Sequence, residues 1–313
     1  MRTYLMLNGM TALATSASAT KQHADITAPN GTTTDYDTSY KHFDCGVSAK
    51  HGSDHFNDTV RAMHHGIFKP GSLLHKPGLH SRDTSMIDAN AVFHVVTKTS
   101  SAGSITQAMA DKQIAVMNEV YNPYNVNFIL VNATFTVNDA WAVGQGSDND
   151  AMKSSLRQGS YSTLNIYFQT DLYGSILGTC SLPSDIGAAP VDPKTYFQDG
   201  CNVQAGTMPG GVIQGYNLGK TAVHETGHWL GLLHVFEGYS CTGDGDFIAD
   251  TPMQSTSTDG CPTKPAKDSC PAATGVDAVH NYMDYSTDAC YTNFTPLQQA
   301  RIADMWATYR KGR

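Results

Sequence analysis

The segment His224-Glu-Thr-Gly-His-Trp-Leu-Gly-Leu-Leu-His234 decides how this chain of 313 residues is interpreted. Helical residues four positions apart differ by about 40° in direction, so His224 and His228 would point the same way and could bind one metal ion. Gly231 can end the helix, because glycine adopts positive φ without a Cβ clash, and His234 could then return as a third ligand. Three neutral imidazoles predict a tetrahedral zinc site with one open position, which is typical of catalytic zinc.

Glu225 follows the first histidine and would project about 100° away from it, past the ion toward a bound water. The chain contains only three glutamates, at positions 119, 225 and 237. A glutamate inside the histidine cluster is therefore not a feature of the background composition. The alternative is a surface helix that carries histidines by coincidence, and the fixed spacing of five residue types argues against it.

Charge and composition exclude two classes of partner. Lys and Arg number 20 against 28 Asp and Glu, which gives a net charge of −8. We expect no nucleic-acid or membrane partner, because an acidic surface without a basic stripe attracts neither polyanion. No apolar run approaches the roughly 18 residues that a membrane span needs. We expect a monomer that acts on an extended peptide or protein substrate.

The N-terminus resembles an export signal. Residues 1–19 contain Arg2, a short apolar stretch and an Ala17-Ser18-Ala19 cleavage site, which predicts a signal peptide and a secreted, extracellular protein. A disordered cytosolic N-terminus is the alternative. Seven cysteines fit an oxidising compartment. Four N-x-S/T sequons suggest a glycoprotein; they begin at Asn30, Asn57, Asn132 and Asn293.

Residues 20–88 are interpreted as a propeptide or loosely ordered leader outside the core, and residues 89–313 as the catalytic domain. The leader is rich in Thr, Ser, Gly and Asp and holds eight of the 13 histidines, which either sequester metal or are ordinary surface residues. Beyond it, hydrophobic patterning predicts alternating strands and helices, hence an α/β fold with a twisted, mostly parallel sheet. The predicted strands are 91–96, 126–131 and 163–170; the predicted helices run from a cap at Ser104 to Tyr121 and from Ala151 to Gln158.

Beyond Gly238 the chain becomes irregular, with many Cys, Pro, Asp and Thr residues. One more helix is predicted near the C-terminus, because Thr295 and Gln298 form a capping box with Pro296 at the first helical position. We therefore expect a regular N-terminal subdomain and an irregular, disulfide-linked C-terminal subdomain that ends in a helix.

The pattern HExxHxxGxxH is shared by the metzincins, and the match extends to VFEG, CTGDGDFIADTP and NYMDY. Over roughly residues 91–313 the chain resembles the pappalysin family, close to its secreted fungal extracellular metalloproteases. The resemblance implies a metzincin-like zincin fold and a zinc endopeptidase. It also implies that Met283 lies beneath the metal in a Met-turn, and that Tyr285 lies near the zinc and can donate a hydrogen bond to a developing oxyanion. Without the resemblance, both would be ordinary core residues.

The implied reaction is hydrolysis of a peptide bond by a zinc-activated water, with Glu225 as general base and then proton donor to the leaving amine. Residues 203–211, VQAGTMPGG, resemble the family's edge strand, along which an extended substrate would pair. An ordinary surface loop is the alternative there. Some relatives select basic residues with an aspartate directly ahead of the domain's last cysteine, but this chain has Ala289 there and Asp288 one position earlier.

Six cysteines follow the leader, and six allow 15 pairings. The resemblance implies Cys241–Cys270 and Cys261–Cys290, which leaves Cys180 with Cys201. The alternative of a second zinc site is disfavoured because no two of these cysteines have C-x-x-C spacing.

Cys45, in the leader, is the odd cysteine. As a thiolate it could occupy the open metal position and keep a zymogen inactive, as in a cysteine switch; the alternative is an unpaired or intermolecular thiol. Arg82 is the nearest candidate for the activating cleavage.

Asp244, Asp246 and Asp250 are concentrated in one loop, which suggests calcium, or else a solvated acidic loop. Two rival functions remain: a silent zinc-binding pseudoprotease that acts as a binding protein, and a non-peptidase zinc hydrolase. The retained Glu225 disfavours the first, and the third histidine disfavours the second.

Overall fold

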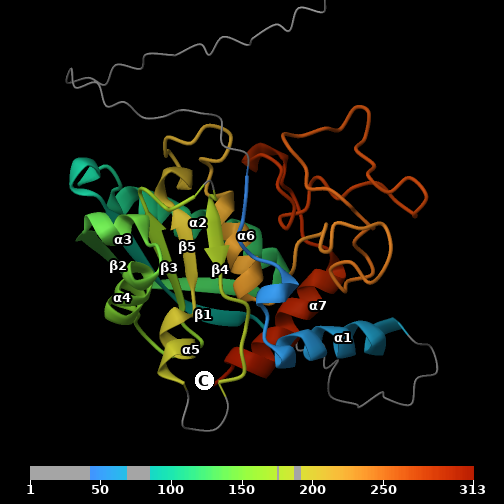
Figure 1. Cartoon of the computed structure of the whole chain (residues 1–313), viewed down its shortest axis with the longest axis horizontal. Helices are drawn as coiled ribbons and strands as arrows, with labels where there is room; N and C mark the ends of the chain where they lie inside the picture. Colours follow the sequence, from blue (N-terminus) through green and yellow to red (C-terminus); the bar gives the residue numbers. More distant parts are fainter. Residues whose placement is uncertain (1–42, 69–84, 175, 187–191) are drawn as a thin grey trace, which may run out of the picture. The chain divides into compact units, whose positions relative to one another are not determined.

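A five-stranded sheet with the order β2-β1-β3-β5-β4 organises the N-terminal half of the domain in this computed structural model (Figure 1). The structure describes residues 43–68, 85–174, 176–186 and 192–313. These residues fall within one compact unit, Tyr40–Arg313. The strands are β1 (Ile87–Thr97), β2 (Val126–Val137), β3 (Leu164–Gln169), β4 (Gly178–Cys180) and β5 (Cys201–Gln204).

The pairing confirms a mostly parallel sheet. Strand β1 runs parallel to β2 and β3, and β3 runs parallel to β5. Only β4, at one edge, is antiparallel to its neighbour β5. The three predicted strands are all present, and β1 and β2 are longer than the apolar patterns indicated. Every residue of β3 is buried, as expected for a strand that is covered on both faces.

Helices cover both faces of this sheet. Figure 1 shows α2 and α6 on one face and α3 and α4 on the other, and the two faces bury separate hydrophobic clusters. The helices are α1 (Asp54–Phe68), α2 (Gln107–Tyr121), α3 (Asp139–Val143), α4 (Ser147–Leu156), α5 (Pro193–Gln198), α6 (Lys220–Trp229) and α7 (Pro296–Met305). No helix of the described residues is both long enough and apolar enough to cross a membrane.

Two predicted helix starts were wrong. Helix α2 is capped by Thr106, whose side chain accepts a hydrogen bond from the backbone N–H of Met109, and not by Ser104. Both residues are good caps, but Thr106 lies immediately ahead of the helical backbone. The predicted helix at Ala151 begins four residues earlier, at Ser147.

Between α6 and the short 3₁₀ turn at Asp288–Cys290 the chain is irregular, as predicted. Three disulfides form with the implied pairings, Cys180–Cys201, Cys241–Cys270 and Cys261–Cys290. Helix α7 opens with the predicted Thr295 capping box and continues into a π-helical turn, Trp306–Arg310.

The expectation of a loose leader outside the core is wrong for residues 43–68. Phe43, Cys45 and Val47 belong to the main hydrophobic cluster, and so do Phe56 and Val60 of α1. A buried apolar face gives this part of the leader the packing that its polar composition concealed. The predicted signal peptide at 1–19, the sequon at Asn30 and the cleavage site at Arg82 lie outside the described residues.

Candidate metal and active site

Helix α6 presents two of the three predicted metal ligands. It ends at Trp229, and Gly231 follows with φ of 87°, as the helix-stop prediction required. A Cβ at Gly231 would also overlap Met305, so this position is restricted both by its backbone conformation and by its neighbour. The turn brings His234 back beside His224 and His228, and all three side chains are buried.

The three imidazoles converge on one point. Their Nε2 atoms are separated by 3.2 Å (His224–His228), 3.1 Å (His228–His234) and 3.2 Å (His224–His234). Ligands at the usual zinc–nitrogen distance and tetrahedral angles would be about 3.3 Å apart, so the spacing fits this ion. The Nδ1 atoms of His224 and His228 lie 2.8 Å from the carbonyls of Tyr282 and Leu232. When Nδ1 donates its hydrogen to these carbonyls, each Nε2 keeps a lone pair that can bind the metal.

Burial favours the neutral form of these rings. Desolvation lowers the pKa of His228 to about 4, and desolvation together with neighbouring histidines lowers the pKa of His224 and His234 well below the ordinary value. Three neutral rings with lone pairs facing one another would repel unless a cation lies between them. The donor set therefore fits a metal ion such as zinc.

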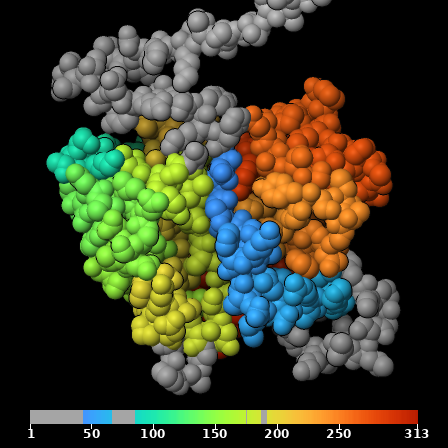
Figure 2. Space-filling view, in the orientation of Figure 1, coloured from blue at the N-terminus to red at the C-terminus, as the bar shows by residue number. Residues whose placement is uncertain are grey.

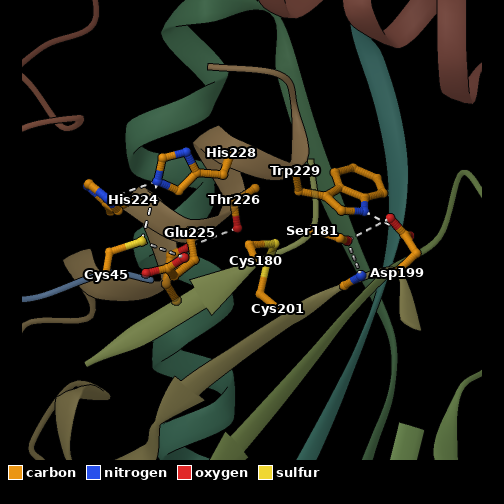
Figure 3. The surroundings of a disulfide bond; sticks show 12 residues. Cys45, Cys180, Ser181, Asp199, Cys201, His224, Glu225, Thr226, His228 and Trp229 are labelled. Carbon is orange, nitrogen blue, oxygen red and sulfur yellow. Dashed lines mark hydrogen bonds between the residues drawn. A yellow bond between two sulfur atoms is a disulfide. The ribbon is translucent and has the colours of Figure 1, made fainter. Parts of the chain in front are cut away.

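Cys45 supplies a fourth donor to the same cluster (Figure 3). Its Sγ lies 3.5 Å from Nε2 of His228 and 3.5 Å from Oε2 of Glu225. A thiolate and an imidazole bound to one zinc ion would be about 3.5 Å apart. Burial, and secondly the charge of Glu225, raise the pKa of the free thiol, whereas a bound cation would favour the thiolate.

The leader reaches this position along the free edge of β4. Cys45 forms a parallel bridge with Gly178, and the N–H of Leu177 donates to the carbonyl of Asp44 at 2.9 Å. Figure 2 shows residues 43–51 in blue, seated between the yellow-green residues around β4 and the orange C-terminal half. Farther along, the N–H of Ala49 donates to Oε1 of Glu237 at 3.0 Å.

Glu225 is fully buried next to the cluster. Desolvation raises the pKa of its carboxyl group to about 8, and its Oε1 has no hydrogen-bond partner among the described residues. A Cβ at Gly178 would overlap this carboxylate, so glycine in β4 allows the edge strand to approach it. A buried carboxylate with one unsatisfied oxygen is suited to accept a proton from a water molecule that enters the site.

Met283 and Tyr285 both lie at the cluster. Met283 is fully buried, and its carbonyl accepts a hydrogen bond from the N–H of Val235, directly after His234. The Tyr285 ring lies 5.0 Å from the ring of His234, measured between centroids. Its hydroxyl accepts from the N–H of Cys45 at 3.0 Å and donates to the carbonyl of Cys45 at 2.9 Å. Burial raises the pKa of this hydroxyl far above its usual range, so it remains a donor.

Asp284, between them, is a residue that motif reasoning did not single out. Its carboxylate accepts from the backbone N–H of Thr258 at 3.0 Å and of Tyr285 at 2.8 Å. It also accepts from Gln254 at 3.0 Å. These bonds fix the backbone between Met283 and Tyr285. The aspartate in NYMDY could have suggested this role, because buried carboxylates commonly order irregular backbone.

Two further aspartates hold the ends of α6 and were also missed in this role. At the N-terminus, Oδ2 of Asp288 accepts from the N–H of Leu218 at 2.7 Å and of Lys220 at 3.4 Å. The helix begins after Gly219, which has no side chain to cap it, so Asp288 provides the cap from a distant loop. Its other oxygen, Oδ1, has no partner among the described residues.

At the C-terminus of α6, Nε of Arg310 donates to the carbonyl of Trp229 at 3.0 Å. The same guanidinium binds both oxygens of Asp199, which also accepts from the indole of Trp229 at 3.1 Å and from Arg157 at 3.3 Å. Figure 3 shows Asp199 and Trp229 on the far side of the Cys180–Cys201 disulfide from the metal cluster. A carboxyl group at the first turn and a guanidinium at the last turn are each placed where a charge of that sign interacts favourably with the helix dipole.

The predicted edge strand at residues 203–211 is wrong. Val203 and Gln204 end β5, which lies between β3 and β4, and residues 205–207 form a 3₁₀ turn. The edge strand on this side of the sheet is β4, at 178–180. The apolar start of VQAGTMPGG reflects an interior strand, and its Pro-Gly-Gly end is a turn.

The predicted calcium group does not assemble. Asp250 accepts from the hydroxyl of Thr295 at 2.6 Å and the N–H of Leu297 at 2.9 Å, so it caps α7. Asp246 is buried and accepts from Thr251 and Ile248. Asp244 is exposed, 3.8 Å from His64. No group of metal-ligating side chains among the described residues includes any of the three.

Sequence comparisons agree with this geometry. The family model described as pregnancy-associated plasma protein-A matches residues 160–307. An extracellular metalloprotease of Aspergillus oryzae is 45% identical over 247 residues, which cover 71% of this chain and 76% of the relative. One from Pyricularia oryzae is 46% identical over 236 residues, which cover 75% and 80%. The chain belongs to the pappalysin-like metalloprotease family.

Solved structures of proteins similar to this chain share its fold. A mutant of Tannerella forsythia promirolysin is 27% identical, with a TM-score of 0.65 over 84% of this chain and 94% of that one. Mature mirolysin in complex with a cleaved peptide is 28% identical, with a TM-score of 0.59 over 73% and 93%. This chain is thus a metalloendopeptidase with a metzincin fold, and family membership implies zinc as its metal.

Proposed function

We propose that His224, His228 and His234 hold a catalytic zinc ion and that Glu225 is the general base for peptide-bond hydrolysis. The observation that carries the proposal is the convergence of three buried Nε2 atoms within 3.2 Å of one another. A zinc ion bound there would polarise the scissile carbonyl and lower the pKa of its bound water.

Glu225 would perform the proton transfers. Its free Oε1 would accept a proton from the attacking water, and the protonated carboxyl would then deliver it to the departing amine. The raised pKa of about 8 makes a protonated intermediate state accessible near neutral pH. Once Cys45 leaves, the hydroxyl of Tyr285 would be free to donate to the developing oxyanion, in place of the carbonyl of Cys45 that it contacts now.

The described conformation would be the latent one. Cys45 would fill the fourth coordination position, and its backbone would engage the hydroxyl of Tyr285. Glu237 would hold the leader at a second point through the N–H of Ala49. Activation would require residues 43–46 to leave β4, which would expose Glu225, Tyr285 and the open ligand position together.

The exposed edge of β4 would then bind the substrate. The leader already pairs with Leu177 and Gly178, which indicates that this edge accepts an added strand. We further propose that the protein is secreted, because its relatives are named extracellular metalloproteases and three disulfides suit an oxidising compartment.

The general-base role is tested with Glu225→Gln, which keeps the size of the side chain. Cleavage of a quenched peptide library should fall about 10²- to 10⁴-fold, while bound zinc, measured by mass spectrometry, should stay near one ion per chain. Glu119→Gln, on the exposed face of α2, is the matched control. His234→Ala should instead lose the metal. Undiminished turnover in Glu225→Gln would move the active site elsewhere.

Latency is tested with Cys45→Ala in the full chain. This variant should cleave the library without prior processing, whereas the parent should require removal of the leader. Ser48→Ala, in the same segment but outside the metal cluster, should remain latent. A Cys45→Ala protein that is as inactive as its parent, although it is folded and loaded with zinc, would refute the switch.

A further inference from the structure

A pocket of about 290 Å³ lies on the face of the sheet opposite the metal. Strand β4 separates the two sites, because neighbouring residues in a strand face opposite sides. Gly178 faces Glu225 on the metal side. Thr179 therefore faces the other side, together with its cross-strand partner Asn202 on β5. Both line the pocket, whose remaining walls come from the α3–α4 connection, the first turn of α4 and Tyr173.

The polar groups of this pocket are arranged for one kind of ligand. Nδ2 of Asn202 donates to Oδ1 of Asn149 at 2.8 Å and to Oε1 of Gln169 at 2.6 Å. These bonds consume both amide hydrogens of Asn202 and leave its Oδ1 as an acceptor. Asn149 uses its oxygen in the same contact, so its Nδ2 remains as a donor. The hydroxyl of Thr179 has no hydrogen-bond partner among the described residues.

The leader indicates which part of a substrate would reach the pocket. Cys45 pairs with Gly178 and points to the metal, and Gly46 follows it along β4. A Cβ at Gly46 would lie 3.3 Å from Oγ1 of Thr179. The residue next to the metal-facing residue is thus directed toward the pocket side of the sheet. In the leader that residue is glycine, and no side chain extends from it.

We propose that this pocket is a specificity subsite for a carboxamide side chain, glutamine above all, at a substrate position beside the one that faces the metal. The inference rests on the proposed peptidase function. A glutamine side chain is long enough to pass Thr179 and reach Asn202 on the neighbouring strand, about 4.8 Å away. Its carbonyl would accept from Nδ2 of Asn149, and its NH₂ would donate to Oδ1 of Asn202.

An apolar side chain of equal size would leave these groups unpaired in the pocket, which disfavours it. Methionine is the closest apolar match to glutamine in length. Glutamate would bring a second negative charge near Asp150, another residue of the pocket lining, whose carboxylate already accepts from Gln198 and lies 3.5 Å from Nζ of Lys194. The inference therefore predicts a ranking of glutamine over methionine and over glutamate at a single position.

The experiment compares peptides that differ only by Gln, Met, Glu or Lys at each position flanking the cleavage site, using the active processed enzyme. At one position, kcat/KM for Gln should exceed that for Met by about three- to tenfold, the contribution of a neutral hydrogen bond. Asn149→Asp keeps the acceptor that Asn202 uses but replaces the free donor. It should lower the ratio of Gln to Lys at that position by about three- to tenfold or more.

Asn132→Asp is the matched control, since it makes the same change on β2 at the opposite edge of the sheet, and it should leave every ratio unchanged. Thr179→Val, which adds no charge, should also weaken the preference for Gln. Cleavage without any Gln preference, or a preference that Asn149→Asp leaves intact, would overturn the subsite while sparing the peptidase function. A zinc-loaded, processed enzyme that cleaves none of the peptides would overturn both.

Discussion

The two ends of helix α6, which carries Glu225 and the first two proposed metal ligands, are held in contrasting ways. At the N-terminal end a single carboxylate, Asp288, binds two backbone N–H groups, and its Oδ1 has no partner among the described residues. At the C-terminal end Asp199 is surrounded by two guanidiniums and an indole. Both aspartates are almost completely buried.

Because of this difference, the pKa values of the two carboxyl groups are shifted in opposite directions, and the stability that each contributes changes with pH in opposite directions. Burial raises the pKa of Asp288 to about 7, because the N–H groups and Lys220 only partly offset the loss of water. Burial opposes ionisation of Asp199 too, but the charges of Arg310 and Arg157 outweigh it and hold its pKa below the ordinary value. A buried carboxylate thus stabilises this helix in its charged form only where fixed cations surround it.

Breaking the C-terminal cluster should have the largest effect. Asp199→Asn would leave Arg157 and Arg310 buried without their counter-charge, which should lower the free energy of unfolding at pH 7 by about 3–5 kcal/mol. Urea denaturation measures the change. Asp58→Asn, which removes the exposed partner of Arg61, should cost no more than about 1 kcal/mol. Equal effects of the two substitutions would contradict a stabilising role for the cluster around Asp199.

A narrower change tests one bond of the same cluster. Trp229→Phe removes the indole N–H that donates to Asp199 and keeps most of the ring packing. Loss of a hydrogen bond to a charged group should cost about 1.5–3 kcal/mol. Trp306→Phe is the control, because the Trp306 side chain is only partly buried and makes no hydrogen bond among the described residues. If both variants lose the same stability, the bond to Asp199 contributes nothing beyond packing.

The N-terminal end should show the smallest effect and the opposite pH response. A carboxyl group whose pKa is raised in the folded state contributes stability that is present below 3.8, its ordinary pKa, and is lost as the pH rises through about 7. Asp288→Asn keeps the acceptor oxygen and cannot ionise. At pH 8 the free energy of unfolding of this variant should be at most about 1 kcal/mol below that of the parent, or above it. Relative to the parent, the variant should become less stable as the pH is lowered to 4.

Paired unfolding curves from pH 4 to 8 would show this as a difference between parent and variant that grows with pH. For Asp199 the pKa is lowered, so its contribution is present above 3.8 and is lost as the pH falls. A variant at Asp288 that becomes relatively less stable as the pH rises would reverse the comparison.

The histidine segment at 224–234 and the regular half were predictable because their patterns are local. The spacing of His224, His228 and Gly231 specifies a helix, a stop and a return, and the structure follows it. The alternating strands and helices from Ile87 to Gln169 were equally visible in the hydrophobic pattern. The disulfide pairing followed from family resemblance, because spacing alone left 15 solutions.

The missed features depend on contacts between residues far apart in the chain. Asp288 caps a helix some 70 positions away, and Asp199 binds an arginine 111 positions away. Residues 43–47 alternate between buried apolar and exposed positions, but this pattern spans only five residues of an otherwise polar leader, and it does not indicate the strand with which the segment pairs. The order of β4 and β5 was also hidden, since a three-residue strand is too short to show periodicity.

The Cys180–Cys201 disulfide has a mechanical consequence for the edge on which the leader lies. Strand β4 spans three residues and offers few hydrogen bonds to β5. A peptide that pairs with the outer edge of β4 could pull so short a strand away from the sheet. The covalent link ties the last residue of β4 to the first of β5, so a departing peptide would separate from β4 before β4 separates from the sheet.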